Sequence, residues 1–172
     1  MAFPPQLRHG DIALTRNPQS LGRIICAVQA FHDPDGQSKY SHSLIITDPT
    51  FFKTIEARNR IWHYDMEEYA GDDVLIARHE SMSAEKHYQE GLVAISKHMG
   101  QRYPWYRIFF HLLGPGFSKW SFGYVVCSEL VAKYLCGCGI FSRWKGYNPG
   151  HLENIFRNYP GWTVWEGKWP EG

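Results

Sequence analysis

The chain has 172 residues, of which 44% are hydrophobic and 20% charged, a composition typical of one globular domain with a substantial core. Its formal net charge of +1 at pH 7 argues against a nucleic acid or an acidic membrane surface as the main partner. The first ten residues lack the apolar core of a signal peptide, and no window approaches the roughly 18 apolar residues of a membrane span. We therefore expect residues 1–172 to form a single cytoplasmic domain with no transmembrane segment.

Six segments carry the patterns of β-strands. They are short, rich in β-branched and aromatic residues and bounded by turn residues, and they cover 10–15, 40–47, 51–57, 61–64, 74–78 and 162–165. Because short connections join most of them, we expect an antiparallel sheet in which consecutive strands are mostly neighbours.

Four segments carry helical periodicity, at 19–31, from Ser81 or Ser83 to Gly100, at 124–135 and at 147–156. The sequence contains no internal repeat, low-complexity run or linker. The predicted fold class is therefore α+β, with an antiparallel sheet packed against helices.

The helix predicted at 124–135 places Cys127 near its amino end. Unpaired backbone N–H groups and the positive end of the helix dipole favour a thiolate there, and they also supply donors for an oxyanion. The alternative is that Cys127 is a small core hydrophobe, as most free cysteines are. A catalytic cysteine needs a base and a third group that orients the base.

His42 is the best-placed candidate base, because it lies inside a predicted strand. If 48–50 is a three-residue loop, Thr47 faces Phe51 and His42 faces Glu56. Residues directly opposite share a face of the sheet, so Glu56 would accept a hydrogen bond from the imidazole and fix its tautomer. A slip of one residue would move Glu56 to the other face.

Two other residues compete for these roles. His63 also lies on a predicted strand, and Asp11 is an alternative acid, although Gly-Asp at the start of a strand is more often a turn. Cys136 and Cys138 lack a second Cys or His pair at zinc spacing, so we expect no metal and no other cofactor.

Taken in chain order, these motifs resemble those of the circularly permuted papain-like cysteine amidases, the YiiX-like branch of the NlpC-type peptidases. The most specific match is Cys-Ser-Glu-Leu-Val at the start of a helix. The other matches are Gly-Asp-Ile at 10–12, Tyr-Ser-His at 40–42, Ile-Glu at 55–56, Gly-x-x-Tyr at 100–103 and Asn-Pro at 148–149 with Leu152.

The resemblance implies a papain-like fold in which Cys127 is the nucleophile, His42 the general base and Glu56 the orienting residue. It also implies that the Cys127 backbone N–H serves an oxyanion hole and that Tyr103 or Tyr40 contributes a substrate-binding hydroxyl. The expected function is a cysteine hydrolase, an amidase or peptidase that cleaves an amide or related acyl bond through a thioester. Its expected partner is a peptide or acyl-amide substrate, with cell-wall peptides among the candidates.

Two alternatives stay open. The thioester could be passed to an amine or a lipid, as in lecithin:retinol-acyltransferase-like proteins, or the scaffold could be a non-enzymatic binding module with an inert cysteine. The aromatic, glycine-containing segment 104–123 is a candidate lid or wall of the substrate groove.

Overall fold

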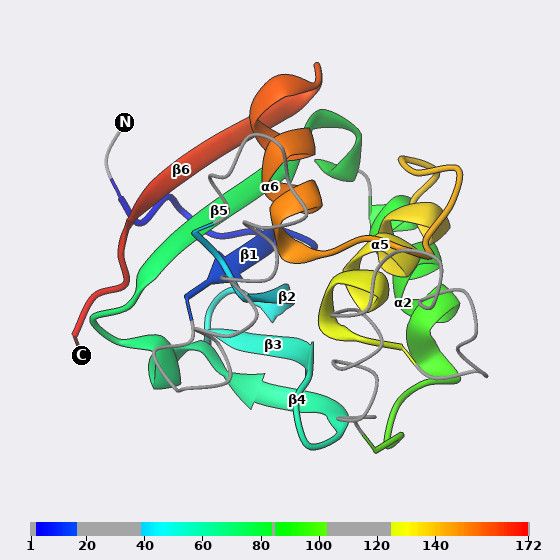
Figure 1. The fold of residues 1–172 in the computed structure, drawn as a ribbon, viewed down its shortest axis with the longest axis horizontal. Coiled ribbons are helices and arrows are strands. Elements are labelled where there is room, and N and C mark those ends of the chain that lie inside the picture. Colours follow the sequence, from blue (N-terminus) through cyan, green and yellow to red (C-terminus); the bar gives the residue numbers. More distant parts are fainter. Residues whose placement is uncertain (1–2, 17–38, 84, 103–124, 172) are drawn as a thin grey trace.

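The computed structural model has an α+β fold, in which a six-stranded antiparallel sheet lies beside a group of helices (Figure 1). It describes residues 3–16, 39–83, 85–102 and 125–171. The helix expected at 19–31, the segment 104–123 and Tyr103 lie outside these residues. Within the described part, no helix has the length and apolar character needed to cross a membrane.

All six predicted strands are present in the sheet. Their bounds are β1 Ile12–Thr15, β2 His42–Asp48, β3 Lys53–Ala57, β4 Ile61–Asp65, β5 Asp73–His79 and β6 Trp162–Lys168. The order across the sheet is β4-β3-β2-β1-β5-β6, and every pair is antiparallel. The predicted sequential order holds from β1 to β4, but β5 pairs with β1 and not with β4.

The link between β4 and β5 explains this departure. It contains the 3₁₀ helix η1 (Met66–Tyr69), in which Met66 and Tyr69 are buried. Both side chains pack in the apolar cluster that includes Leu44 and Ile46 of β2. The link therefore runs over one face of the sheet and delivers β5 to the far side of β1.

The described α-helices correspond to three of the four predicted helices. They are α2 (Glu85–Ser96), preceded by the 3₁₀ helix η2 (Glu80–Ser83), then α5 (Cys127–Gly137) and α6 (Pro149–Asn158). Helix α2 is shorter than predicted, because the chain forms turns after Ser96. Helix α6 begins as expected at Pro149, and the Asn148 side chain accepts the N–H of His151 as its cap.

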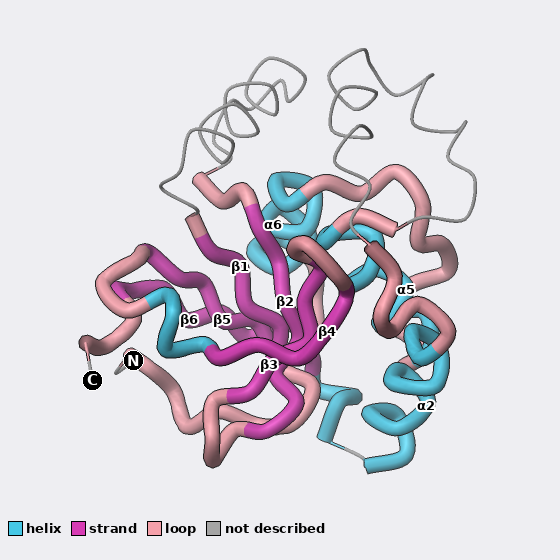
Figure 2. The backbone as a smooth tube through the Cα atoms, turned by 90° about the horizontal axis from the view of Figure 1, so that it is seen from below, coloured by secondary structure: helices cyan, strands magenta, loops and turns pink. Residues whose placement is uncertain are grey.

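The sheet separates two apolar clusters. Ile12, Leu14 and Ile45 point into the larger one, which contains the buried faces of α2, α5 and α6. Side chains alternate along a strand, so the residues next to these in the sequence point to the other face of the sheet, into the smaller cluster. Helices α2 and α5 lie side by side, and both views place them at the side of the molecule away from its two termini (Figures 1 and 2).

Two glycines allow α2 and α5 to approach this closely. A Cβ atom added at Gly91 would lie 2.4 Å from Tyr134 Cε2, and one added at Gly137 would lie 2.7 Å from the Ala94 Cβ. Close packing leaves no room for either methyl group. The rigid contact fixes α5, and with it the position of Cys127.

The register between β2 and β3 differs from the predicted one by two residues. Glu56 lies opposite Leu44, not opposite His42. The strands are joined by the four residues 49–52, Phe52 has a φ of 51°, and an irregularity interrupts the pairing between Ile46 and Asp48. Side chains alternate with a period of two, so this even shift keeps His42 and Glu56 on the same face.

Candidate active site

Cys127 is the first residue of α5, one position beyond the cap residue Val126. The first backbone hydrogen bond of the helix runs from the Leu130 N–H to the Val126 carbonyl. Residues 127–129 therefore precede the intrahelical bonding, and their N–H groups give this end of the helix its positive character. The Cys127 side chain is buried, with 6% of the residue exposed.

His42, the first residue of β2, lies close enough to Cys127 for each side chain to shift the pKa of the other. Its Nε2 lies 2.8 Å from Glu56 Oε2. A carboxylate can only accept, so Nε2 carries the hydrogen that is donated to it. Nδ1 is then the ring nitrogen that can exchange a proton with the thiol. The structure thus brings together the three predicted catalytic residues, Cys127, His42 and Glu56.

Glu56 has no solvent-exposed surface and is held by four donors. Besides His42, the Thr54 hydroxyl donates to Oε1 at 2.7 Å, and the Tyr69 hydroxyl donates to Oε2 at 2.6 Å. The Arg58 guanidinium forms an ion pair with Oε2 at 3.1 Å. The buried carboxylate is therefore both charge-compensated and fixed in orientation.

These contacts shift the ionisation of all three residues. Burial alone would lower the pKa of His42, but the negative partners Cys127 and Glu56 raise it well above its ordinary value. Burial would raise the pKa of the Cys127 thiol, but His42 and hydrogen bonding from Ser43 lower it. Burial likewise opposes ionisation of Glu56, yet the hydrogen bonds from His42, Tyr69 and Thr54 hold its pKa below the usual value. All three shifts favour a thiolate–imidazolium pair beside a carboxylate.

The two residues after Cys127 attach a distant loop to the start of α5. The Ser128 hydroxyl donates to the Tyr147 carbonyl at 2.7 Å, and the Gly146 N–H donates to Glu129 Oε1 at 3.3 Å. Ser128 and Glu129 are both buried. The Ser-Glu part of the motif therefore has a structural role here, because it ties the loop before α6 to the cysteine.

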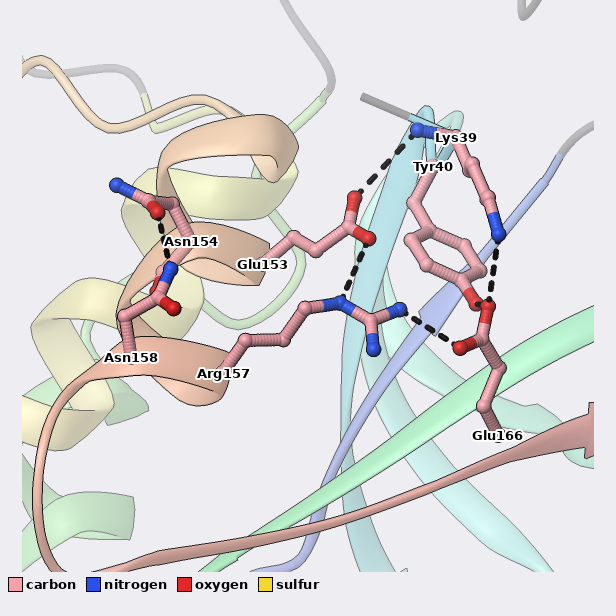
Figure 3. Close-up of polar contacts among 7 residues, drawn as sticks. All are labelled: Lys39, Tyr40, Glu153, Asn154, Arg157, Asn158 and Glu166. Atoms are coloured by element: carbon pink, nitrogen blue, oxygen red, sulfur yellow. Dashed lines mark hydrogen bonds and ion pairs between the residues drawn. The ribbon is translucent and has the colours of Figure 1, made fainter. Parts of the chain in front are cut away.

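Tyr40 lies in the core and not on a substrate-facing surface. The residue is fully buried, and its hydroxyl donates to Glu166 Oε1 at 2.9 Å. Figure 3 shows the network around it, in which Arg157 donates to Glu153 at 3.0 Å and to Glu166 at 2.8 Å. The Lys39 N–H also donates to Glu153, at 3.4 Å. This network fastens the chain just before His42 to α6 and β6.

The rival candidates lie elsewhere. His63 is exposed on β4. Asp11 is buried, accepts the Arg8 N–H at 2.8 Å and forms an ion pair with Arg78 at 2.6 Å. Asp11 is therefore a structural anion.

Sequence reasoning missed the residues that support Glu56. Thr54 and Arg58 flank it at a spacing of two residues, so strand periodicity alone would have placed them on its face. Tyr69 left no such signal, because it reaches Glu56 only through the way η1 folds over the sheet.

No protein-family model matches this chain, and a search of curated proteins finds no significant match. Among solved structures, the chain is similar to the metalloprotein YiiX from Escherichia coli O157:H7. The TM-score is 0.59 at 19% sequence identity, and the alignment covers 96% of this chain and 99% of the other. At this identity the similarity shows a shared fold over essentially the whole domain.

Proposed function

We propose that this protein is a papain-like cysteine hydrolase of amide or related acyl bonds, with Cys127 as nucleophile, His42 as general acid and base, and Glu56 as the orienting residue. The observation that carries the proposal is the 2.8 Å contact between His42 Nε2 and the buried Glu56 Oε2, together with the buried Cys127 thiol at the start of α5, whose pKa His42 lowers. An activated nucleophile with an oriented base is the arrangement that acyl transfer requires.

The order of the residues supports a permuted form of the papain-like fold. The histidine strand and the acid strand precede the cysteine helix, as the resemblance of the motifs implies. The fold of the chain is shared with YiiX over 96% of its residues.

The reaction would begin with attack of the Cys127 thiolate on the substrate carbonyl carbon. A sulfur–carbon bond forms, and the oxyanion lies near the N–H groups at the start of α5. Collapse of the intermediate breaks the carbon–nitrogen bond, and the His42 imidazolium gives its proton to the leaving amine. Neutral His42 then takes a proton from water, the hydroxide attacks the thioester, and the carbon–sulfur bond breaks to release the acid and the thiolate.

Glu56 would act without changing its own protonation. It would accept the Nε2–H of His42, which leaves Nδ1 as the nitrogen that exchanges a proton with the thiol, and its charge would stabilise the imidazolium. The orientation of Glu56 in this pair would depend on Thr54, Tyr69 and Arg58, which occupy the remaining acceptor sites of the carboxylate.

The structural neighbour is described as a metalloprotein. Within the described residues, no group of three or more His, Cys, Asp and Glu side chains is placed to hold a metal ion. The Glu56 oxygens already accept from four protein donors, which makes this carboxylate a poor ligand. Glu56 therefore does not fit the role of a metal ligand.

The test is formation of a covalent acyl-enzyme, measured by mass spectrometry with a panel of peptide amides and acyl esters. We expect an adduct on Cys127 and turnover that falls at least about 1,000-fold in Cys127→Ala and in His42→Ala. Cys136→Ala, on the same helix, and His63→Ala, on an exposed strand position, are the matched controls and should keep full activity.

An adduct that forms equally in His42→Ala, or that maps to Cys136 or Cys138, would refute the assignment. Product analysis with an added amine or lipid acceptor separates hydrolysis from transfer. A product that appears only with the acceptor would overturn hydrolysis while keeping the same nucleophile.

A further inference from the structure

A second site lies further along α5, where Lys133 contacts His98 in the turn after α2. It is a pocket of about 310 Å³ lined by Lys97, His98, Gln101, Lys133, Trp144 and Lys145. Lys133 is six residues after Cys127, which corresponds to about 9 Å along the helix axis. None of these lining residues belongs to the site around Cys127.

The pocket gathers positive charge around one aromatic ring. Lys133 Nζ lies 4.5 Å from the centre of the Trp144 ring, and Lys145 Nζ lies 5.4 Å from it. Burial and the neighbouring ammonium groups of Lys97 and Lys145 lower the pKa of Lys133. Lys97 and Lys145 are therefore both close enough to repel Lys133.

No carboxylate compensates this charge within the described residues. Ion pairs elsewhere join Lys39, Lys53 and Lys86 to acidic side chains, but none involves Lys97, Lys133 or Lys145. Among the residues that the structure describes, Lys97, Lys133 and Lys145 therefore form one pocket without an ion pair to a carboxylate.

His98 holds one of these cations in place. The residue is 5% exposed, its Nδ1 lies 3.0 Å from Gln101 Oε1, and Lys133 Nζ donates to its Nε2 at 2.7 Å. Burial and the positive charges of Lys133 and Lys97 lower the pKa of His98, although the bond to Gln101 opposes this. A neutral imidazole that accepts from Lys133 fixes the ammonium group in the pocket.

We propose that this pocket binds a phosphate group, carried either by a small soluble molecule or by a lipid headgroup. Three ammonium groups offer several donors from different directions, which suits the tetrahedral oxygens of a phosphate. The cations among the described lining residues are lysines, which bind phosphate as point charges and need no planar partner. Bound phosphate would relieve the repulsion among the lysines. This inference does not depend on the chemistry proposed at Cys127.

The first test is a titration of the full chain with inorganic phosphate, at constant ionic strength, followed by the NMR signal of the Trp144 indole N–H. Trp144→Phe assigns the signal. We expect a saturable shift, and affinity that falls at least about tenfold in the triple variant Lys97→Gln/Lys133→Gln/Lys145→Gln, because each charged hydrogen bond contributes substantially. The double variant Lys97→Gln/Lys145→Gln changes only exposed side chains, and it replaces the triple variant in this titration if the triple variant does not fold.

The matched control is Lys53→Gln/Lys86→Gln/Lys168→Gln, which removes the same charge at exposed positions away from the pocket. It should bind phosphate as the unchanged chain does. A parallel sedimentation assay uses phosphatidylcholine vesicles with and without phosphatidic acid. Binding that is lost in the pocket triple variant is pocket-dependent. If only binding to the vesicles is pocket-dependent, the ligand is a lipid headgroup. If binding to free phosphate is pocket-dependent, the ligand is a soluble molecule. Absence of both, or equal weakening by the two triple variants, would overturn the proposal.

Discussion

Replacing Glu56 by Gln tests the role of the buried carboxylate, because it removes the charge and keeps the shape. The carboxylate accepts hydrogen bonds from His42, Thr54 and Tyr69. A bond to a charged group is worth about 1 kcal/mol more than a bond between neutral groups. Three such bonds give an expected loss of about 3 kcal/mol in the free energy of unfolding, within the range measured when a buried ion pair is broken.

The assay is urea unfolding at pH 7, followed by circular dichroism and extrapolated linearly to water. Glu68→Gln is the matched control, because Glu68 binds the same Arg58 at 2.6 Å but its side chain is 50% exposed. Its expected loss is below about 1 kcal/mol. Equal losses in the two variants, or a loss below about 0.5 kcal/mol in Glu56→Gln, would refute the reasoning.

The loss of stability in Glu56→Gln should also depend on pH, in a direction that the pKa of Glu56 determines. The pKa of Glu56 is lowered in the folded protein from an ordinary value of 4.5. Its contribution to stability is therefore present above about pH 4.5 and is lost as the pH falls through the lower folded-state pKa. The difference between the unchanged chain and Glu56→Gln should shrink between pH 4.5 and pH 3. A difference that stays constant over this interval would contradict the assigned charge.

Three further substitutions test the scaffold by the same unfolding assay. Tyr69→Phe removes the 2.6 Å bond to Glu56 and should cost about 1.5–3 kcal/mol, since the acceptor is charged. Gly91→Ala forces a methyl group against Tyr134 and should cost about 1–3 kcal/mol. Asn148→Ala removes the cap of α6 and should cost about 1 kcal/mol.

Each of these has a matched control at an exposed or half-exposed position. Tyr64→Phe loses a hydroxyl that donates to the Arg60 carbonyl at 3.1 Å, Ser96→Ala lies on the same helix as Gly91, and Asn154→Ala lies in the middle of α6. We expect each control to change stability by less than its partner. A control that costs as much as its partner would show that the named contact is not the cause.

Local patterns predicted the elements of this fold well. The strands alternate with a period of two, and α6 begins with a recognisable Asn-Pro cap. The pairing was harder, because Phe52 adopts a positive φ that its residue type does not signal, and the turn is one residue longer than predicted. The predicted register was wrong by two residues. Because side chains alternate with a period of two, His42 and Glu56 still lie on the same face and remain in contact.

Long-range relations could not be predicted from these patterns. Nothing in the local sequence places β5 beside β1, or Tyr69 over Glu56, because both depend on how the β4–β5 link crosses the sheet. The family resemblance implied that Tyr40 contributes a substrate-binding hydroxyl, yet the residue is buried and its hydroxyl donates to Glu166. The basic pocket unites residues from three separate segments, so it became visible only in the structure.

The most direct test of the catalytic assignment is the pH dependence of iodoacetamide alkylation at each cysteine, measured by mass spectrometry in the unchanged chain and in His42→Ala. An ordinary thiol titrates near pH 8.5. The account predicts that Cys127 reaches half its maximal rate well below that pH, and that this midpoint rises toward the ordinary value in His42→Ala. A midpoint that matches those of Cys136 and Cys138, or that is the same in His42→Ala, would contradict the assignment of Cys127 and His42 as a catalytic pair.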